Sequence, residues 1–187
     1  MAEKRKNWNG LISGFSASDL VFLDESGCNT DMTRRYAYSF GGSRAVDSTP
    51  LSKPKNTTIL SSIQLNGTLH YTTFSGGTTV ERFKRYLETD LLPHLNGNSI
   101  LVMDNMKSHH AKAVKELLDS SGVRYIYLPP YSPDLNPFEK LWSKVKALLR
   151  KFKARTLDAL PNAIQNAFHS VTVSDCSGWF RFCGYAL

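Results

Sequence analysis

The sequence predicts an α/β domain in which helices flank a mixed β-sheet, and two local patterns carry this prediction. The first is a β-hairpin, since residues 57–65 and 68–74 are rich in β-branched and aromatic side chains and are joined by the turn dipeptide Asn66-Gly67. The second is a β-α-β unit with an apolar strand at 100–103, a helix at 111–121 and a strand at 123–128. Because a hairpin pairs antiparallel strands and a β-α-β unit favours parallel pairing, both kinds of pairing are expected in the sheet.

Two further elements precede the β-α-β unit. Residues 20–23 form a compact apolar strand that ends at Asp24, and the following residues 25–27 (Glu-Ser-Gly) are expected to turn the chain. Between residues 80 and 92, apolar side chains recur every three or four positions, as they do along one helix face. The strand at 100–103 also ends in an aspartate, Asp104, so two apolar strands each deliver a carboxylate where they reach the surface.

The C-terminal part is expected to be helical. A proline-rich loop at 129–137 leads into a helix with Asn136 as N-cap, Pro137 at the first helical position and Glu139 at the third, where it forms half of a capping box. Apolar residues along 138–149 supply the buried stripe of this helix. A second helix is expected at about 157–170, and the aromatic tail is expected to pack against the domain.

Length and composition indicate one globular domain. The chain has 187 residues, of which 41% are hydrophobic and 21% charged, as in ordinary proteins with one core. Residues 1–19 are polar, rich in glycine and serine, and too few for a folded module. We therefore expect an N-terminal lead-in segment at 1–19, with no folded domain, and one domain at 20–187.

The cysteine count and the hydropathy pattern predict where the protein resides. Three cysteines without CxxC spacing argue against a disulfide framework and against a zinc site. No stretch resembles a signal peptide or a membrane span, so no membrane partner is expected. A reduced protein of the cytoplasm, with access to the nucleoid, is the simplest interpretation.

The charge balance favours a polyanionic partner. Lys and Arg outnumber Asp and Glu by 23 to 16, and the sequence pI is about 9.4. Basic residues are dense in the helix that follows Glu139, where a solvated helix face is the alternative to phosphate contact. The candidate DNA contacts from this pattern are Arg34, Arg35, Lys140, Lys144, Arg150 and Lys151.

Three acids, Asp24, Asp104 and Glu139, form the candidate catalytic constellation. Each alone has a structural explanation, as a turn former at a strand end or as a helix cap. Two aspartates at strand ends and a glutamate at a helix start are together placed to meet at one edge of the sheet. Hard divalent cations prefer oxygen ligands and are held by a few carboxylates plus substrate phosphate, so this set suits a hard divalent cation such as Mg²⁺.

Three segments around these acids resemble the DDE transposases of the mariner superfamily, and most closely their bacterial insertion-sequence branch. The segments are FLDESG at 22–27, MDN at 103–105 and LPPYSPDLNPFEKLW at 128–142. The 34 residues between Asp104 and Glu139 are also typical of that branch. The chain departs from the pattern at Phe138, where Ile is usual, and at Lys140, where Asn is common, and the latter places a positive charge beside the third acid.

The resemblance implies a ribonuclease H-like fold and a metal-dependent transposase that cleaves phosphodiester bonds at transposon ends and joins the 3′-hydroxyl to target DNA. It implies that Asp24, Asp104 and Glu139 bind two Mg²⁺ or Mn²⁺ ions and carry catalysis. His109 falls where relatives place a histidine after the second aspartate, which makes it a further candidate for contact with DNA or the active site. Glu25 is expected to point to the opposite strand face from Asp24.

The expected partner is double-stranded DNA, including transposon ends and target DNA, with the protein acting as a homodimer. Relatives carry helix-turn-helix modules that residues 1–19 cannot hold, so a separate or fused upstream polypeptide is the expected source of end recognition. Two alternatives remain open: a domesticated or inactive transposase-derived protein that binds DNA without chemistry, and a ribonuclease H-like nuclease. The three acids favour an enzyme over the first, and the loop at 129–137 argues against the second.

Overall fold

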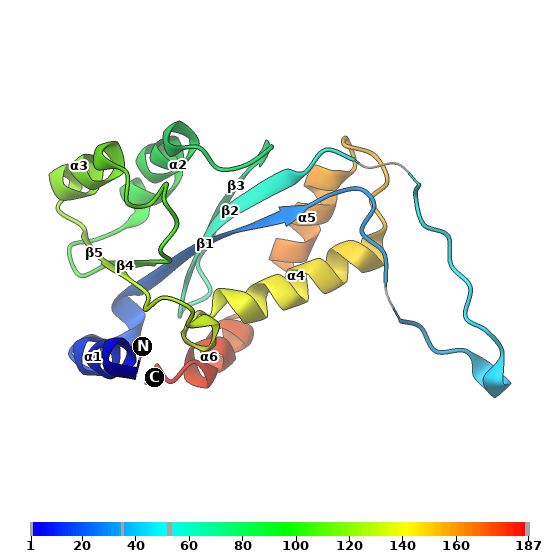
Figure 1. Cartoon of the computed structure of the whole chain (residues 1–187), viewed down its shortest axis with the longest axis horizontal. Helices are drawn as coiled ribbons and strands as arrows, with labels where there is room; N and C mark the ends of the chain where they lie inside the picture. Colours follow the sequence, from blue (N-terminus) through cyan, green and yellow to red (C-terminus); the bar gives the residue numbers. More distant parts are fainter. Residues whose placement is uncertain (1, 35, 52–53, 186–187) are drawn as a thin grey trace.

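A computed structural model describes residues 2–34, 36–51 and 54–185 and shows one mixed five-stranded sheet (Figure 1). The strand order is β3-β2-β1-β4-β5. The central strand pairs antiparallel with β2 and parallel with β4, so the mixed sheet expected from the hairpin and the β-α-β unit is confirmed. The strands are β1 (Leu20–Cys28), β2 (Thr57–Gln64), β3 (Leu69–Ser75), β4 (Ile100–Met103) and β5 (Arg124–Tyr127).

The turn expected directly after Asp24 is wrong. Strand β1 continues to Cys28, because β2 pairs with it along the whole length from Val21 to Cys28. Strand β4, its neighbour on the other side, ends at Met103. Asp24 therefore lies where β1 loses its parallel partner but keeps its antiparallel one, and the carboxylate is held by a paired strand instead of a turn.

Alternation along β1 divides the core into two layers. Leu20 and Phe22 pack into the layer that also contains helices α4 (Phe138–Phe152), α5 (Leu160–His169) and α6 (Val173–Phe182). Val21 and Leu23 face the opposite layer, which contains α2 (Val80–Tyr86) and α3 (Lys112–Ser121). Figure 1 shows these two groups of helices on opposite sides of the sheet. Side chains alternate between strand faces, so Asp24 belongs to the α4 side and Glu25 to the α2 side.

The helix expected at 80–92 changes its winding. After α2 the backbone forms a π-helical turn at Leu87–Leu91 and a 3₁₀ turn at Leu92–His94. Pro93 has no N–H to donate to a continuing α-helix, which is the physical reason for an end at this position. The predicted helices at 111–121 and 157–170 are confirmed as α3 and α5, within one residue and three residues of their expected starts.

Both ends of the described chain carry helices that were not predicted. Helix α1 (Ala2–Ile12) lies within the lead-in segment, and its Trp8 is buried in the α4 layer. At the other end, the tail forms α6, which begins with a capping box between Thr172 and Asp175. Apolar periodicity is weak in α1, and the contacts that hold it come from residues more than 100 positions away, such as Asp134. None of the helices in the described residues is both long and apolar enough to cross a bilayer.

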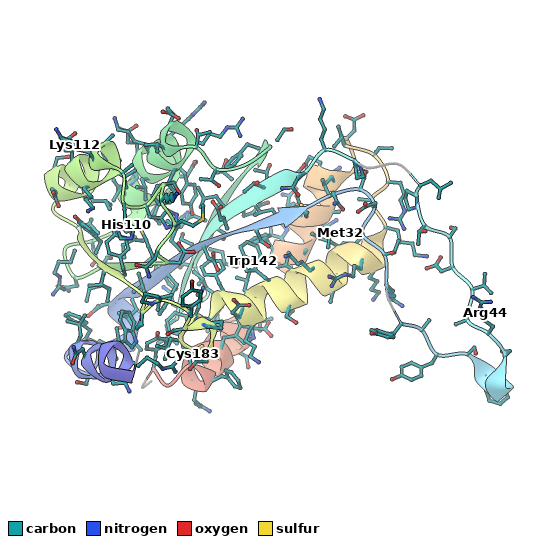
Figure 2. All side chains as sticks on the ribbon, in the orientation of Figure 1. Met32, Arg44, His110, Lys112, Trp142 and Cys183 are labelled. Atoms are coloured by element: carbon teal, nitrogen blue, oxygen red, sulfur yellow. The ribbon has the colours of Figure 1, made fainter. Side chains whose placement is uncertain are left out.

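The described residues between β1 and β2, 29–34, 36–51 and 54–56, form an excursion that extends far from the sheet (Figure 1), and Arg44 lies near its outer end (Figure 2). Its base is attached to the domain by Arg155, whose guanidinium donates to the carbonyl oxygens of Thr30 and Met32 at 3.1 and 3.0 Å. Further out, Lys153 forms an ion pair with Asp47 at 2.7 Å. Several large apolar side chains of the excursion are almost fully exposed, namely Tyr36, Tyr38, Phe40, Val46 and Leu51.

Candidate active site

Asp24, Asp104 and Glu139 border one cavity of about 680 Å³. The sheet explains the first two, because Leu23 of β1 and Met103 of β4 are paired in register and the next residue of each strand is the aspartate. Helix α4 supplies Glu139 in its first turn, from the layer that packs against the Asp24 face of β1. The structure thus brings all three predicted acids to one edge of the sheet.

The Asp24 carboxylate is half-buried and held at both oxygens. Its Oδ1 accepts a hydrogen bond from the backbone N–H of Glu25 at 2.7 Å, and its Oδ2 accepts one from the side-chain amide of Asn136 at 2.9 Å. Burial raises the pKa of Asp24 to about 6, and the nearby charge of Asp104 adds to the increase. Both effects penalise the ionised carboxylate, and a cation in the cavity would offset them.

Asp104 is stabilised as a carboxylate by its own loop. Its Oδ1 lies 2.8 Å from Nδ1 of His109 and 3.0 Å from the backbone nitrogen of Met106. Burial raises the pKa of Asp104, but these two hydrogen bonds and the electrostatic influence of His109 and His110 together outweigh it, and the net shift is downward. Next to it, Asn105 donates to the carbonyl oxygen of Leu128 at 2.5 Å and ties the end of β4 to the end of β5.

His109 supports Asp104 from inside the protein. The His109 side chain is fully buried, and its ring packs against Phe83 with a centroid distance of 4.2 Å. Its backbone carbonyl accepts a hydrogen bond from the hydroxyl of Tyr127 at 3.0 Å. A side chain with no exposed surface has no route to DNA in this conformation, so of its two expected roles the structure favours the one at the active site.

Glu139 differs from both aspartates, because its residue is exposed and its carboxylate has no hydrogen bond to another described residue. Only its backbone is held, with the N–H donating to the carbonyl oxygen of Asn136 at 3.1 Å. The helix starts at Phe138, one residue later than predicted, with Pro137 before it. Asn136 Oδ1 still accepts the Phe138 N–H at 3.1 Å, but Glu139 does not return a capping-box contact. Among the three acids, Glu139 is the one whose carboxylate no described residue holds in place.

The donor set of the cavity suits a hard divalent cation. It offers carboxylate oxygens from three elements, and the Oδ2 of Asp104 and both oxygens of Glu139 have no hydrogen bond to another described residue. Among the described residues, no three Asp, Glu, His or Cys side chains are arranged to hold a metal ion between them. The acids therefore fit such a site by chemistry and by location, and Glu139 has the rotational freedom to complete it.

The proline-rich loop forms one wall of the cavity and is held from both ends of the chain. Arg5 of α1 forms an ion pair with Asp134, and the Tyr185 hydroxyl donates to the carbonyl oxygen of Leu135 at 2.5 Å. Tyr131 at the rim is 87% exposed and has a backbone φ of 56°, which is unfavourable for a residue with a Cβ. The predicted ordered loop is present. Asp134 is paired with Arg5 and is not part of the carboxylate cluster.

Glu25 also contacts the cavity rim, yet its carboxylate accepts a hydrogen bond from Thr78, which lies just before α2. This contact places it on the α2 side of β1, as expected from strand alternation.

The predicted DNA contacts do not share one surface. Lys144 forms an ion pair with Asp175 at 2.5 Å and donates to the carbonyl oxygen of Ser170 at 2.9 Å, so it joins α4 to α6 inside the domain. Lys140 places its ammonium 3.9 Å from the ring centroid of Phe182. Arg34, Arg150 and Lys151 line a second cavity of about 610 Å³ between α4 and the excursion, together with Tyr36. Arg35 lies outside the described residues.

Two residues that the sequence analysis did not select also line the carboxylate cavity: Trp142 and Lys146. They lie three and seven positions after Glu139 on α4, so helical periodicity places them on the same face as Glu139. Figure 2 shows Trp142 between α4 and the sheet. Its indole N–H is buried and has no hydrogen-bond partner among the described residues, so it is a free donor beside the acids.

Fold and site together define a ribonuclease H-like domain with three acids at one edge of a mixed sheet, a fold shared with solved transposase structures. The Mos1 mariner paired end complex with Mn superposes with a TM-score of 0.80 at 21% identity, covering 96% of this chain and 58% of that chain. The catalytic domain of Mos1 mariner transposase superposes with a TM-score of 0.73 at 17% identity, covering 96% and 85% of the two chains.

Sequence comparison identifies the family. The DDE superfamily endonuclease pattern matches residues 19–161, and the chain belongs to this family. The chain is also similar to the transposable element Tc1 transposase of Caenorhabditis elegans, with 27% identity over 97 residues, which are 50% of this chain and 36% of the relative. It thus spans only part of the curated transposases that it matches.

Proposed function

We propose that this chain is the catalytic domain of a DNA transposase that cleaves phosphodiester bonds at transposon ends and joins the freed 3′-hydroxyl to target DNA. The observation that carries the proposal is the meeting of Asp24, Asp104 and Glu139 at one cavity, although they come from two strands and a helix. Membership of the DDE superfamily endonuclease family supports the cleavage step, since the family is named for endonuclease activity.

We propose further that these three acids hold Mg²⁺ or Mn²⁺, as two ions. Such ions activate the attacking oxygen and stabilise the leaving oxygen in phosphoryl transfer. The rest of the site orients the ligands: His109 and the Met106 N–H hold Asp104, and the Asn136 amide holds Asp24. The Mos1 mariner paired end complex with Mn supports the choice of ion by analogy.

DNA is the proposed partner, and two groups of residues are placed to bind it. Lys146 and the Trp142 N–H line the cavity and can donate to phosphate oxygens near the acids. Arg34, Arg150 and Lys151 lie further along α4 and fit contact with the phosphate backbone away from the cut.

Several finer assignments belong to the same proposal. They are membership of the bacterial insertion-sequence branch, a location at the bacterial nucleoid, a homodimer on DNA, and recognition of transposon ends by a separate helix-turn-helix polypeptide.

Substitution of the three acids tests the proposal. Asp24→Asn, Asp104→Asn and Glu139→Gln each remove a carboxylate charge and keep the side-chain shape, so each is expected to abolish cleavage while thermal unfolding changes little. Labelled duplex DNA carrying the repeats that flank the gene is incubated with Mg²⁺, Mn²⁺ or EDTA, and nicking and strand joining are followed on gels.

The matched control is Glu116→Gln, which removes an exposed acid from α3 on the other side of the sheet. This variant is expected to cleave like the unmodified protein. Cleavage at the normal rate by any of the three acid variants contradicts the assignment of that acid.

A further inference from the structure

Asn136 makes contact with two of the three acids at once. Its side-chain amide donates to Asp24 Oδ2 at 2.9 Å, across 112 residues of sequence. Its backbone carbonyl accepts the N–H of Glu139 at 3.1 Å. One residue thus links β1, at the point where its parallel pairing with β4 ends, to the first turn of α4, which carries the third acid.

The amide of Asn136 has a defined orientation, because both of its ends are used. Oδ1 accepts the N–H of Phe138 at 3.1 Å, which caps the helix, and Nδ2 must then face Asp24. The residue is only 7% exposed, so neither contact is easily replaced by water. The Trp142 indole N–H lies near enough to lower the pKa of Asp24 but is not within hydrogen-bonding geometry of it. Among the described residues, Asn136 is therefore the side chain that donates to Asp24, besides the backbone N–H of Glu25.

We propose that Asn136 is a positioning residue that sets the orientation of the Asp24 carboxylate toward the metal and keeps it in register with Glu139. This inference rests on the proposed function, because it concerns how the same site receives Mg²⁺ or Mn²⁺. Because the Asn136 donor occupies one lone pair of Asp24 Oδ2, it fixes which lone pairs of the carboxylate remain for the cation. Loss of a hydrogen-bond donor that orients a metal ligand commonly lowers metal affinity or activity about 10- to 100-fold.

Helix capping alone is the competing role, and two substitutions separate it from positioning. Serine is as good an N-cap as asparagine, but its side chain is too short to reach Asp24, so Asn136→Ser keeps the cap and removes the donor. Asn136→Asp keeps both the cap and the volume and replaces the donor by an oxygen. Both variants are therefore expected to unfold near the temperature of the unmodified protein.

Two measurements test the proposal on the full chain. Mn²⁺ binding without DNA is followed by the loss of the free-ion signal in electron paramagnetic resonance, and cleavage is followed against Mn²⁺ concentration. For Asn136→Ser, we expect Mn²⁺ affinity to fall about tenfold or more, and the Mn²⁺ concentration for half-maximal cleavage to rise by a similar factor. For Asn136→Asp, whose added charge can itself attract Mn²⁺, cleavage is the readout, and it is expected to fall about tenfold or more.

Asn96→Asp is the matched control, because Asn96 also caps backbone N–H groups with its Oδ1, those of Asn98 and Ser99 at 2.9 and 3.2 Å, and does not line the cavity. This variant is expected to bind Mn²⁺ and cleave normally. If Asn136→Ser binds Mn²⁺ normally, or if Asn136→Asp cleaves normally, Asn136 is only a cap and the inference is overturned.

The same experiment distinguishes this inference from the proposed function. A chain that binds Mn²⁺ through Asp24 but cleaves no DNA contradicts the transposase proposal, and the Mn²⁺ affinity of Asn136→Ser still decides the role of Asn136. A chain that neither binds Mn²⁺ nor cleaves overturns both.

Discussion

His109 shows at the scale of one residue how a buried side chain can act on chemistry without touching DNA. Its Nδ1 lies 2.8 Å from Asp104, and because a carboxylate only accepts, Nδ1 must carry the proton. We predict that His109→Phe, which keeps an aromatic ring against Phe83 but removes the donor, lowers cleavage about tenfold or more. His109→Asn, which retains a donor near Nδ1, should recover part of this loss.

DNA affinity separates this role from phosphate contact. Both His109 variants are expected to bind a duplex with unchanged dependence on salt, measured by fluorescence anisotropy at several salt concentrations. A weaker salt dependence in His109→Phe would assign His109 to a phosphate contact and contradict the buried placement.

The three cysteines are predicted to be inert in the folded protein. Cys28, Cys176 and Cys183 are free and buried, and burial raises the pKa of each thiol to about 11. Thiolate is the reactive form, so little of it is present at pH 7 to 8. Titration with a thiol-reactive dye should give no fast modification in native buffer and three modified thiols in denaturant. Fast reaction of any native thiol would show that its environment opens readily.

Single residues also show where prediction from sequence stops. Asp104 was correctly expected at a strand end, because the boundary of a short apolar run is a local feature. Asp24 was not, because β2 pairs with β1 as far as Cys28 and only the parallel pairing with β4 ends before it. The partner of Asp24 is Asn136, 112 positions away, and no local pattern reports such a contact. Lys144 was expected to bind DNA because helical periodicity indicates a polar face. Periodicity does not indicate that Asp175 of another helix forms an ion pair with it.

At the scale of elements, the ion pair between Lys144 and Asp175 joins α4 to α6. Both side chains are about one-third exposed or less. Burial acts to raise the pKa of Asp175, but the hydrogen bonds from Lys144 and Thr172 and the charge of Lys144 together outweigh it, and the net shift is downward. A carboxyl group with a lowered pKa stabilises the fold above its ordinary pKa of 3.8 and loses this contribution as the pH falls below it.

We predict that a double-mutant cycle of Lys144→Ala and Asp175→Ala gives a coupling free energy of about 1 kcal/mol in urea unfolding. The cycle is needed because Asp175 also caps α6 through Thr172, and the cycle cancels this contribution. The coupling should be constant between pH 5 and 8. A coupling near zero, or one that changes within this range, would contradict the interaction between the two helices.

The elements differ in how well the sequence predicts them. The β2-β3 hairpin and strand β4 were expected within one or two residues, because turn chemistry and short apolar runs are sufficient there. Strand β1 runs four residues beyond Asp24 because β2 pairs with it, and pairing is not a local property. Helix α1 depends on the burial of Trp8 and on Arg5 reaching Asp134, so its own sequence pattern is weak.

At the scale of the whole molecule, the question is which face of the sheet binds DNA. The formal net charge is +7, but the cations are distributed over both layers. Arg34, Arg150 and Lys151 lie on the α4 side, and Lys146 continues this set to the carboxylate cavity. The exposed cations Arg85, Lys112 and Lys115 belong to α2 and α3 on the opposite side.

We predict that replacing Arg34, Arg150 and Lys151 together by Ala weakens DNA binding and flattens the plot of log affinity against log salt concentration. The expected loss is about 0.9 units of slope for each phosphate contact removed from duplex DNA, because each contact releases counterions. The matched control replaces Arg85, Lys112 and Lys115 by Ala, which removes the same charge from the other face. Equal loss of slope in both triple variants would mean that DNA binding depends on the net charge of the protein and not on the position of these cations. A loss only in the control would place the DNA on the α2 and α3 side, away from Asp24, Asp104 and Glu139, and the proposed path of the DNA along α4 would be wrong.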